Sequence, residues 1–142
     1  MTNRIMSAPH IDHIGIVVAD LDAALETLRP LLGEPARTKV LADAGLRVAE
    51  FEAANVTVEL LQYDGPAEFA REVMGERLGL NHISARVGDI AQALGELRRA
   101  GLEPMPGFPR QGAHGQVAFF EPDPVTGLRF EICQPDPHGK DP

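Results

Sequence analysis

The chain has 142 residues, a formal net charge of −8 and a single cysteine, Cys133. A chain of this length buries about two thirds of its unfolded surface on folding, so we expect one core. The net negative charge argues against a nucleic acid or an anionic membrane as partner. With one cysteine, no internal disulfide can form. No apolar run approaches the roughly 20 residues of a membrane span.

The first predicted elements are a strand at residues 11–18 and a helix at residues 21–32. Asp20 stands where a helix N-cap belongs, leucine and alanine then recur at helical spacing, and Gly33 offers a stop. Three strands follow, at residues 38–42, 46–53 and 56–62, separated by residues typical of turns. The pattern predicts a β-α-β-β-β module.

A second module follows a connecting segment that contains a short helix. A strand at residues 80–87 precedes the N-cap candidate Asp89, a helix at residues 90–100 ends before Gly101, and strands are expected at residues 116–121 and 128–134. The predicted organisation is therefore a flexible N-terminus (1–8), a first module (9–63), a connecting segment (64–79), a second module (80–135) and a flexible tail (136–142).

The two modules resemble each other in sequence. A shift of 69 residues pairs His13 with His82 and Asp20 with Asp89, and a shift of 72 residues pairs Glu59 with Glu131 and Gln62 with Gln134. Two matching blocks in the same order at nearly the same shift favour duplication of one module.

The alternation of residues along each strand predicts where the four repeated His and Glu side chains point. In each strand the apolar residues on either side of the His or Glu face the helix, so His13, Glu59, His82 and Glu131 face away from it. If this face of the sheet were flat and exposed to solvent, the four side chains would be ordinary polar surface residues. If the two sheets curl around a shared cleft, the four side chains converge into a donor set suited to Zn, Ni, Co, Fe or Mn.

Four stretches then carry a family resemblance, namely "IDHIGIVVADLDAAL", "VTVELLQ", "LNHISARVGDIAQAL" and "GAHGQVAFFEPDPVTGLRFEICQP". In this order they resemble the vicinal oxygen chelate (glyoxalase/bleomycin resistance) superfamily, most closely its methylmalonyl-CoA epimerase branch. The resemblance implies an α+β fold in which two tandem βαβββ modules form a curled open sheet around a shared cleft. It also implies a divalent metal ion (Co, Ni, Zn or Mn) held by His13, Glu59, His82 and Glu131.

The chemistry implied by the resemblance is proton transfer next to a carbonyl group, with methylmalonyl-CoA or a similar acyl-CoA as substrate. Glu131 would act both as metal ligand and as acid/base. The family's opposing base falls on Val48, which cannot take a proton, so Glu50 is the expected substitute, with Glu52 on the same face of the strand. The family's "HPK" segment is replaced by "EPDP" at residues 121–124, which removes a cation that could have met CoA phosphates.

Two alternatives stay open beside the epimerase. One is a glyoxalase I-type lyase acting on a glutathione hemithioacetal, and the other is a non-catalytic, ligand-sequestering protein of the antibiotic-resistance type, which characteristically lacks the metal ligands. Arg86 and Arg129 are expected either to bind a substrate carboxylate or to pair with Glu50 or Glu52. His114 is either functional or a turn residue.

The expected partner is a small molecule, with no nucleic acid and no membrane, and the expected assembly is a homodimer. The N-terminal "MTNRIMSAPH" lacks the apolar region of a signal peptide, which predicts a cytoplasmic location.

Overall fold

The structure is a computed structural model and describes residues 9–112 and 115–136. His114 and the expected flexible N-terminus lie outside the described residues, as does the expected tail except for Asp136. Contacts divide the chain into two units, His13–Ile83 (the first unit) and the residues before and after it (the second unit). β1 (His10–Val17) and β5 (Gly79–Arg86) each contribute residues to both units.

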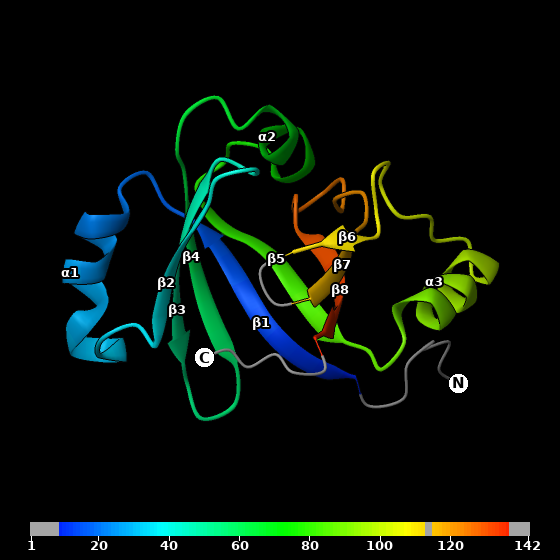
Figure 1. Cartoon of the computed structure of the whole chain (residues 1–142), viewed down its shortest axis with the longest axis horizontal. Coiled ribbons are helices and arrows are strands. Elements are labelled where there is room, and N and C mark those ends of the chain that lie inside the picture. The colour runs from blue at the N-terminus through cyan, green and yellow to red at the C-terminus, as the bar shows by residue number, and fades with distance from the viewer. Residues whose placement is uncertain (1–8, 113–114, 137–142) are drawn as a thin grey trace. The chain divides into compact units, whose positions relative to one another are not determined.

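The first unit contains α1 (Leu21–Leu32), β2 (Arg37–Leu41), β3 (Leu46–Glu52), β4 (Thr57–Tyr63) and α2 (Glu68–Met74). Its strands are hydrogen-bonded in the order β2-β3-β4-β1-β5. β2, β3 and β4 are antiparallel neighbours, whereas β1 runs parallel to β4. Figure 1 shows α1 beside β2, β3 and β4, and the expected short helix of the connecting segment is confirmed as α2.

The second unit contains α3 (Ile90–Arg99), β6 (Arg110–Gln111), β7 (Gly115–Phe119) and β8 (Arg129–Pro135). Its strands follow the order β5-β8-β7-β6, and β8, β7 and β6 are antiparallel neighbours. The strands predicted at residues 116–121 and 128–134 correspond to β7 and β8. The two-residue strand β6 was not located from the sequence, because two residues are too few to show an alternating pattern.

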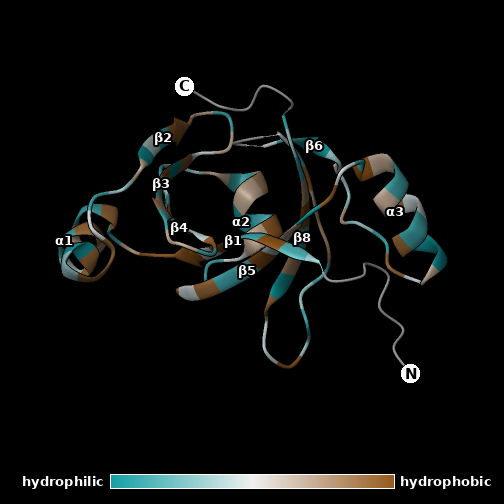
Figure 2. Ribbon diagram, turned by 90° about the horizontal axis from the view of Figure 1, so that it is seen from below, coloured by the Kyte–Doolittle hydropathy of each residue, from teal (hydrophilic) through white to brown (hydrophobic). Residues whose placement is uncertain are grey.

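One apolar core lies between α1 and the strands of the first unit and another between α3 and the strands of the second, where the chain length had predicted a single core. In the first unit the stripe of α1 packs on Ala49, Phe51 and Leu60, and in the second the stripe of α3 packs on Ala118, Phe120 and Ile132. The polar and apolar bands of both helices are visible in Figure 2. The predicted helix-facing residues Ile16, Val18 and Val58 pack against the first core, which confirms the predicted orientation of these strands.

The two modules repeat the same contacts at the start of their helices. Asp20 accepts a hydrogen bond from the Ala23 amide at 3.1 Å, and Asp89 accepts one from the Gln92 amide at 3.0 Å, so both predicted N-caps are confirmed. The paired glutamines also match: Gln62 Oε1 accepts from the Leu21 amide at 2.6 Å and Gln134 Oε1 from the Ile90 amide at 2.8 Å. This shared pattern supports duplication.

The structure confirms the predicted α+β class. Within residues 9–112 and 115–136, eight strands are hydrogen-bonded in series as one sheet, and the elements of each module occur in the order β-α-β-β-β. The boundaries predicted for the modules and the shared cleft stay predictions. Among the described residues, no helix is both long and apolar enough to cross a membrane.

Candidate metal and proton-transfer site

A row of paired residues crosses the strands of the first unit. Gly15 of β1 pairs with Glu59 of β4, Glu59 with Glu50 of β3, and Glu50 with Arg37 of β2. Residues that pair directly on neighbouring strands present their side chains on the same face. His13 shares this face because it lies two residues before Gly15. The row is therefore on the face opposite α1, as the sequence predicted.

The three predicted ligands of the first unit lie together on this face. His13 Nε2 is 3.7 Å from Glu59 Oε1, and both side chains are only 7% exposed. The rings of His13 and His82 meet edge to face, with centroids 5.5 Å apart. A ring nitrogen of His13 lies within 4.8 Å of one of His82. His13 of β1 thus lies close both to a carboxylate of β4 and to an imidazole of β5, and all three side chains are buried.

The ring of His82 lies directly against the backbone of Gly15. A methyl group placed on Gly15 would come within 2.1 Å of Cε1 and 2.5 Å of Nε2 of His82. On its other nitrogen, His82 Nδ1 is 2.9 Å from Asn81 Oδ1, a buried hydrogen bond. The absence of a side chain at residue 15 therefore provides the space in which the His82 ring sits.

Glu50 is the more buried of the two substitute bases considered for Val48. It is 1% exposed, and Arg37 Nη1 donates to its Oε1 at 3.3 Å, while Arg37 Nη2 donates to Glu52 at 3.3 Å. The Glu52 side chain is 60% exposed. Val48 of β3 is itself buried and pairs with Leu61 of β4. The position expected for the second base therefore holds an apolar residue, and so does the position opposite it on β4.

Glu131 lies on β8 in the second unit and is 4% exposed. It occupies the repeat position of Glu59, yet its partner on the neighbouring strand is Phe119, where Glu59 has Glu50. The two copies therefore differ: a pair of adjacent carboxylates occurs across β3 and β4 and is absent from the corresponding positions of β7 and β8.

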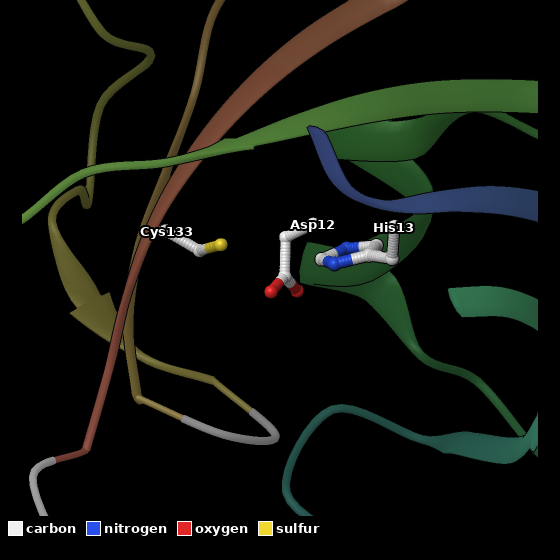
Figure 3. Close-up of side chains that lie close together, drawn as sticks. All are labelled: Asp12, His13 and Cys133. Carbon is white, nitrogen blue, oxygen red and sulfur yellow. The ribbon is translucent and has the colours of Figure 1, made fainter. Parts of the chain in front are cut away.

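Arg86 and Cys133 lie near Asp12 in the second unit. Arg86 donates from Nε and Nη2 to Asp12 Oδ1 at 3.0 and 2.6 Å, so the carboxylate that it pairs with is Asp12, which neither of its two expected roles included. Figure 3 shows the thiol of Cys133 directed toward the Asp12 side chain. Burial raises the pKa of the Cys133 thiol to about 12, so the thiol keeps its proton at neutral pH.

Arg129, the other arginine considered for substrate binding, donates from Nη1 to the Gly127 carbonyl at 3.1 Å. Sequence reasoning also missed Arg37 and Asn81. Arg37 lies one residue before the predicted strand 38–42, and pairing that strand with residues 46–53 would have placed it opposite Glu50. Asn81 directly precedes the ligand His82, but adjacency along a strand gives no sign of a side-chain hydrogen bond.

The family model described as Glyoxalase/Bleomycin resistance protein/Dioxygenase superfamily matches residues 12–120. The chain belongs to this superfamily. An ethylmalonyl-CoA/methylmalonyl-CoA epimerase of Cereibacter sphaeroides is 32% identical over 129 residues, which cover 87% of this chain and 96% of that protein. The uncharacterized protein YqjC of Bacillus subtilis is 31% identical over 130 residues, which cover 88% of this chain and 91% of that protein.

Solved structures agree with this membership in the glyoxalase superfamily. A methylmalonyl-CoA epimerase in complex with methylmalonyl-CoA and NH4+ superposes with a TM-score of 0.74 at 26% identity, covering 96% of this chain and 100% of that chain. The predicted resemblance is thereby confirmed. His13, Glu50, Glu59 and His82 lie within the matched residues 12–120 and Glu131 lies beyond them, and the roles of all five stay predictions.

Proposed function

We propose that this superfamily member is a divalent-metal-dependent epimerase that moves a proton α to a carbonyl group, with methylmalonyl-CoA or a similar acyl-CoA as substrate. The observation that carries the proposal is the gathering of His13, His82 and Glu59, all buried, on one face of the first unit. A ligand-sequestering protein of the antibiotic-resistance type would not need these three residues. The similarity to acyl-CoA epimerases supports the choice of substrate.

The donor set fits a divalent ion of the Co, Ni, Zn or Mn type. Imidazole nitrogens together with carboxylate oxygens suit these ions, and His13 has both a carboxylate oxygen of Glu59 at 3.7 Å and a ring nitrogen of His82 within 4.8 Å. The space left by Gly15 accommodates the His82 ring within the set. His13, Glu59 and His82 would hold the ion, with Glu131 as the fourth ligand by its repeat relation to Glu59.

The bound ion would supply a Lewis acid that offsets negative charge developing on the substrate's carbonyl oxygen. The residues of this chain would move the proton. One carboxylate removes the α-proton from one face of the substrate carbon, and a protonated carboxylate returns a proton to the opposite face, so the configuration inverts with no net change in atoms. We assign these roles to Glu131 and Glu50.

The assignment of Glu50 rests on its burial and on its place in the row of paired residues. It lies directly across from Glu59 on the neighbouring strand, and Arg37 provides a counter-charge for its buried carboxylate. Glu52 shares the arginine but is largely exposed to solvent. Glu50→Gln should therefore impair proton transfer, and Glu52→Gln is the matched control that should not.

The test is solvent deuterium exchange into a panel of acyl-CoA substrates and a glutathione hemithioacetal, using metal-loaded protein. We expect exchange at the α-carbon of methylmalonyl-CoA or a similar acyl-CoA. Turnover of the hemithioacetal alone would overturn the epimerase in favour of a glyoxalase I-type lyase. Binding of a small molecule without exchange in any substrate would overturn catalysis altogether.

A matched pair of variants tests the acid/base role of Glu131. Glu131→Gln retains an oxygen ligand but cannot take a proton, so we expect exchange to fall by a factor of about 10² or more while metal binding weakens only partly. Glu59→Gln, at the equivalent position of the first copy, should reduce exchange far less. Metal content and deuterium incorporation are measured under the same conditions, and equal losses of exchange would show that Glu131 is a ligand only.

The homodimer and the cytoplasmic location are part of the same proposal. Sedimentation of the purified chain tests the first, and fractionation of the source cells tests the second.

A further inference from the structure

We propose that Asn81 is a positioning residue that holds the neutral His82 ring in the tautomer with its proton on Nδ1. The inference rests on the proposed metal site, since its consequence is that Nε2 of His82 carries the lone pair used for an ion. All of the residues that carry it belong to the first unit.

The side-chain amide of Asn81 is oriented by the end of α2. Met74 is the last residue of this helix, and the carbonyl groups of a final helical turn have no partner within the helix. Asn81 Nδ2 donates a hydrogen bond to the Met74 carbonyl at 2.8 Å. Only the amide nitrogen of Asn81 can donate to a carbonyl, so this contact decides which way the amide points.

The orientation of the amide then decides the protonation of His82. With Nδ2 turned to Met74, the atom that faces the ring is Oδ1, which is 2.9 Å from His82 Nδ1. An amide oxygen can only accept, so the neutral ring must donate from Nδ1. Asn81 and His82 are 3% and 2% exposed, which leaves little room for water to replace either partner.

The consequence for the candidate site follows from the chemistry of imidazole. A neutral ring with its proton on Nδ1 has its lone pair on Nε2, and a hydrogen bond to the remote nitrogen fixes both the tautomer and the ring orientation of a ligating histidine. Gly15 also limits the ring, because a Cβ at residue 15 would come within 2.1 to 2.7 Å of Cε1, Nε2 and Nδ1 of His82. Asn81 therefore links the packing of α2 to the donor atom of His82.

The primary test is ¹⁵N NMR of the metal-free protein, recorded where the ring is neutral. In the parent we expect a protonated Nδ1 and an unprotonated Nε2 for His82. Asn81→Ala should give a mixture of tautomers and lower the affinity for Co²⁺, used alone as the probe, by a factor of about 10 to 100. Asn81→Asp retains an acceptor for Nδ1–H and should keep the parent tautomer.

A second variant separates this role from simple tethering of α2. The Tyr63 hydroxyl also binds the end of α2: its one proton is donated to the carbonyl of Gly75, the residue after the helix, and the Ala70 carbonyl lies farther away, at 3.4 Å. Tyr63→Phe should lower the unfolding midpoint, yet leave the His82 tautomer as in the parent and the Co²⁺ affinity within about twofold.

Either of two results would overturn the proposal: a parent His82 with its proton on Nε2, or a folded Asn81→Ala protein with the parent's tautomer and Co²⁺ affinity. The first needs no variant to fold. If the parent binds no Co²⁺, the proposed function fails, while the tautomer measurement still decides the role of Asn81.

Discussion

At the scale of single residues, the position of the His82 ring depends on residue 15 being a glycine, which has no side chain. Gly15 is paired with Glu59, and the His82 ring covers its Cα. The constraint is steric, because any Cβ at this position would overlap the ring. A glycine within a strand commonly marks such a close approach.

Gly15→Ala should therefore displace the His82 ring. We expect a loss of about 1–3 kcal/mol in the free energy of unfolding from overpacking, together with at least a tenfold loss of Co²⁺ affinity. Gly95→Ala in α3 is the matched control, since its Cβ would meet nothing closer than Arg99 Nη1 at 3.8 Å and alanine is the better helix former. Urea unfolding and Co²⁺ titration measure both effects, and unchanged Co²⁺ affinity in Gly15→Ala would contradict the steric argument.

The buried thiol of Cys133 makes stability depend on pH in the alkaline range. Its pKa is raised from 9.0 to about 12 by burial, so in the folded protein the thiol keeps its proton where the unfolded chain has lost it. Below pH 9 both states hold the proton and there is no effect. As the pH rises from about 9 toward 12, only the unfolded state ionises, and the folded state loses stability.

We expect the urea midpoint of the parent to fall faster than that of Cys133→Ala between pH 8 and pH 10. At pH 8, iodoacetamide should alkylate the native thiol far more slowly than the thiol of urea-unfolded protein. Equal pH slopes in parent and variant would show that Cys133 does not contribute, and rapid native alkylation would show that the thiol is accessible.

At the scale of elements, one glutamine in each module joins the last strand to the start of the helix. Gln62 of β4 accepts from the first amide of α1, and Gln134 of β8 does the same for α3. The first amides of a helix have no intrahelical acceptor, and Asp20 and Asp89 satisfy only one of them each. The glutamines therefore complete the N-terminal cap from a strand about 40 residues away in sequence.

Gln62→Ala and Gln134→Ala should each lower the free energy of unfolding by about 1 kcal/mol, the usual net value of one hydrogen bond. Glutamate at either position should be tolerated, because it keeps the acceptor and places a negative charge at a helix N-terminus. Gln92→Ala is the control, since its side chain makes only an exposed contact with Glu96. Urea unfolding is the measurement, and a loss no larger than that of Gln92→Ala would remove the capping role.

At the scale of the whole molecule, the proposed ligands are widely separated along the chain. His13, Glu59, His82 and Glu131 lie on four different strands, so an unfolded chain has no preformed set. An ion that binds the folded protein alone must therefore stabilise it.

We expect about one divalent ion per chain, and a rise in unfolding free energy of about 2.7 kcal/mol when the free ion concentration is 100 times the Kd. EDTA should reverse the rise in Tm. His13→Ala and His82→Ala should bind Co²⁺ weakly and show little rise. Metal analysis and thermal unfolding give the values, and a stoichiometry near two or an unchanged rise in the histidine variants would argue against a single shared site.

Much of the fold and of the candidate site follows from rules that act over a few residues. The N-caps at Asp20 and Asp89, the periodicity of both helices and the alternation in β1 and β4 are local patterns, and the structure agrees with them. Internal repetition extended these patterns to the pairing of His13 with His82 and Glu59 with Glu131. The type of every element except β6, and the face of each candidate ligand, were therefore readable from the sequence.

Strand register and long-range contacts determined which side chains are neighbours in the folded chain. Glu50 was one of two equivalent residues until the register placed it across from Glu59 and buried it beside Arg37. Asp12 was not among the partners expected for Arg86, because it is 74 residues away in sequence. The contact of Gly15 with the His82 ring and the orientation of Asn81 by α2 depend on segments that meet only in the folded chain. Local patterns indicate which face a side chain occupies, whereas its neighbours on that face are determined by how the strands pair.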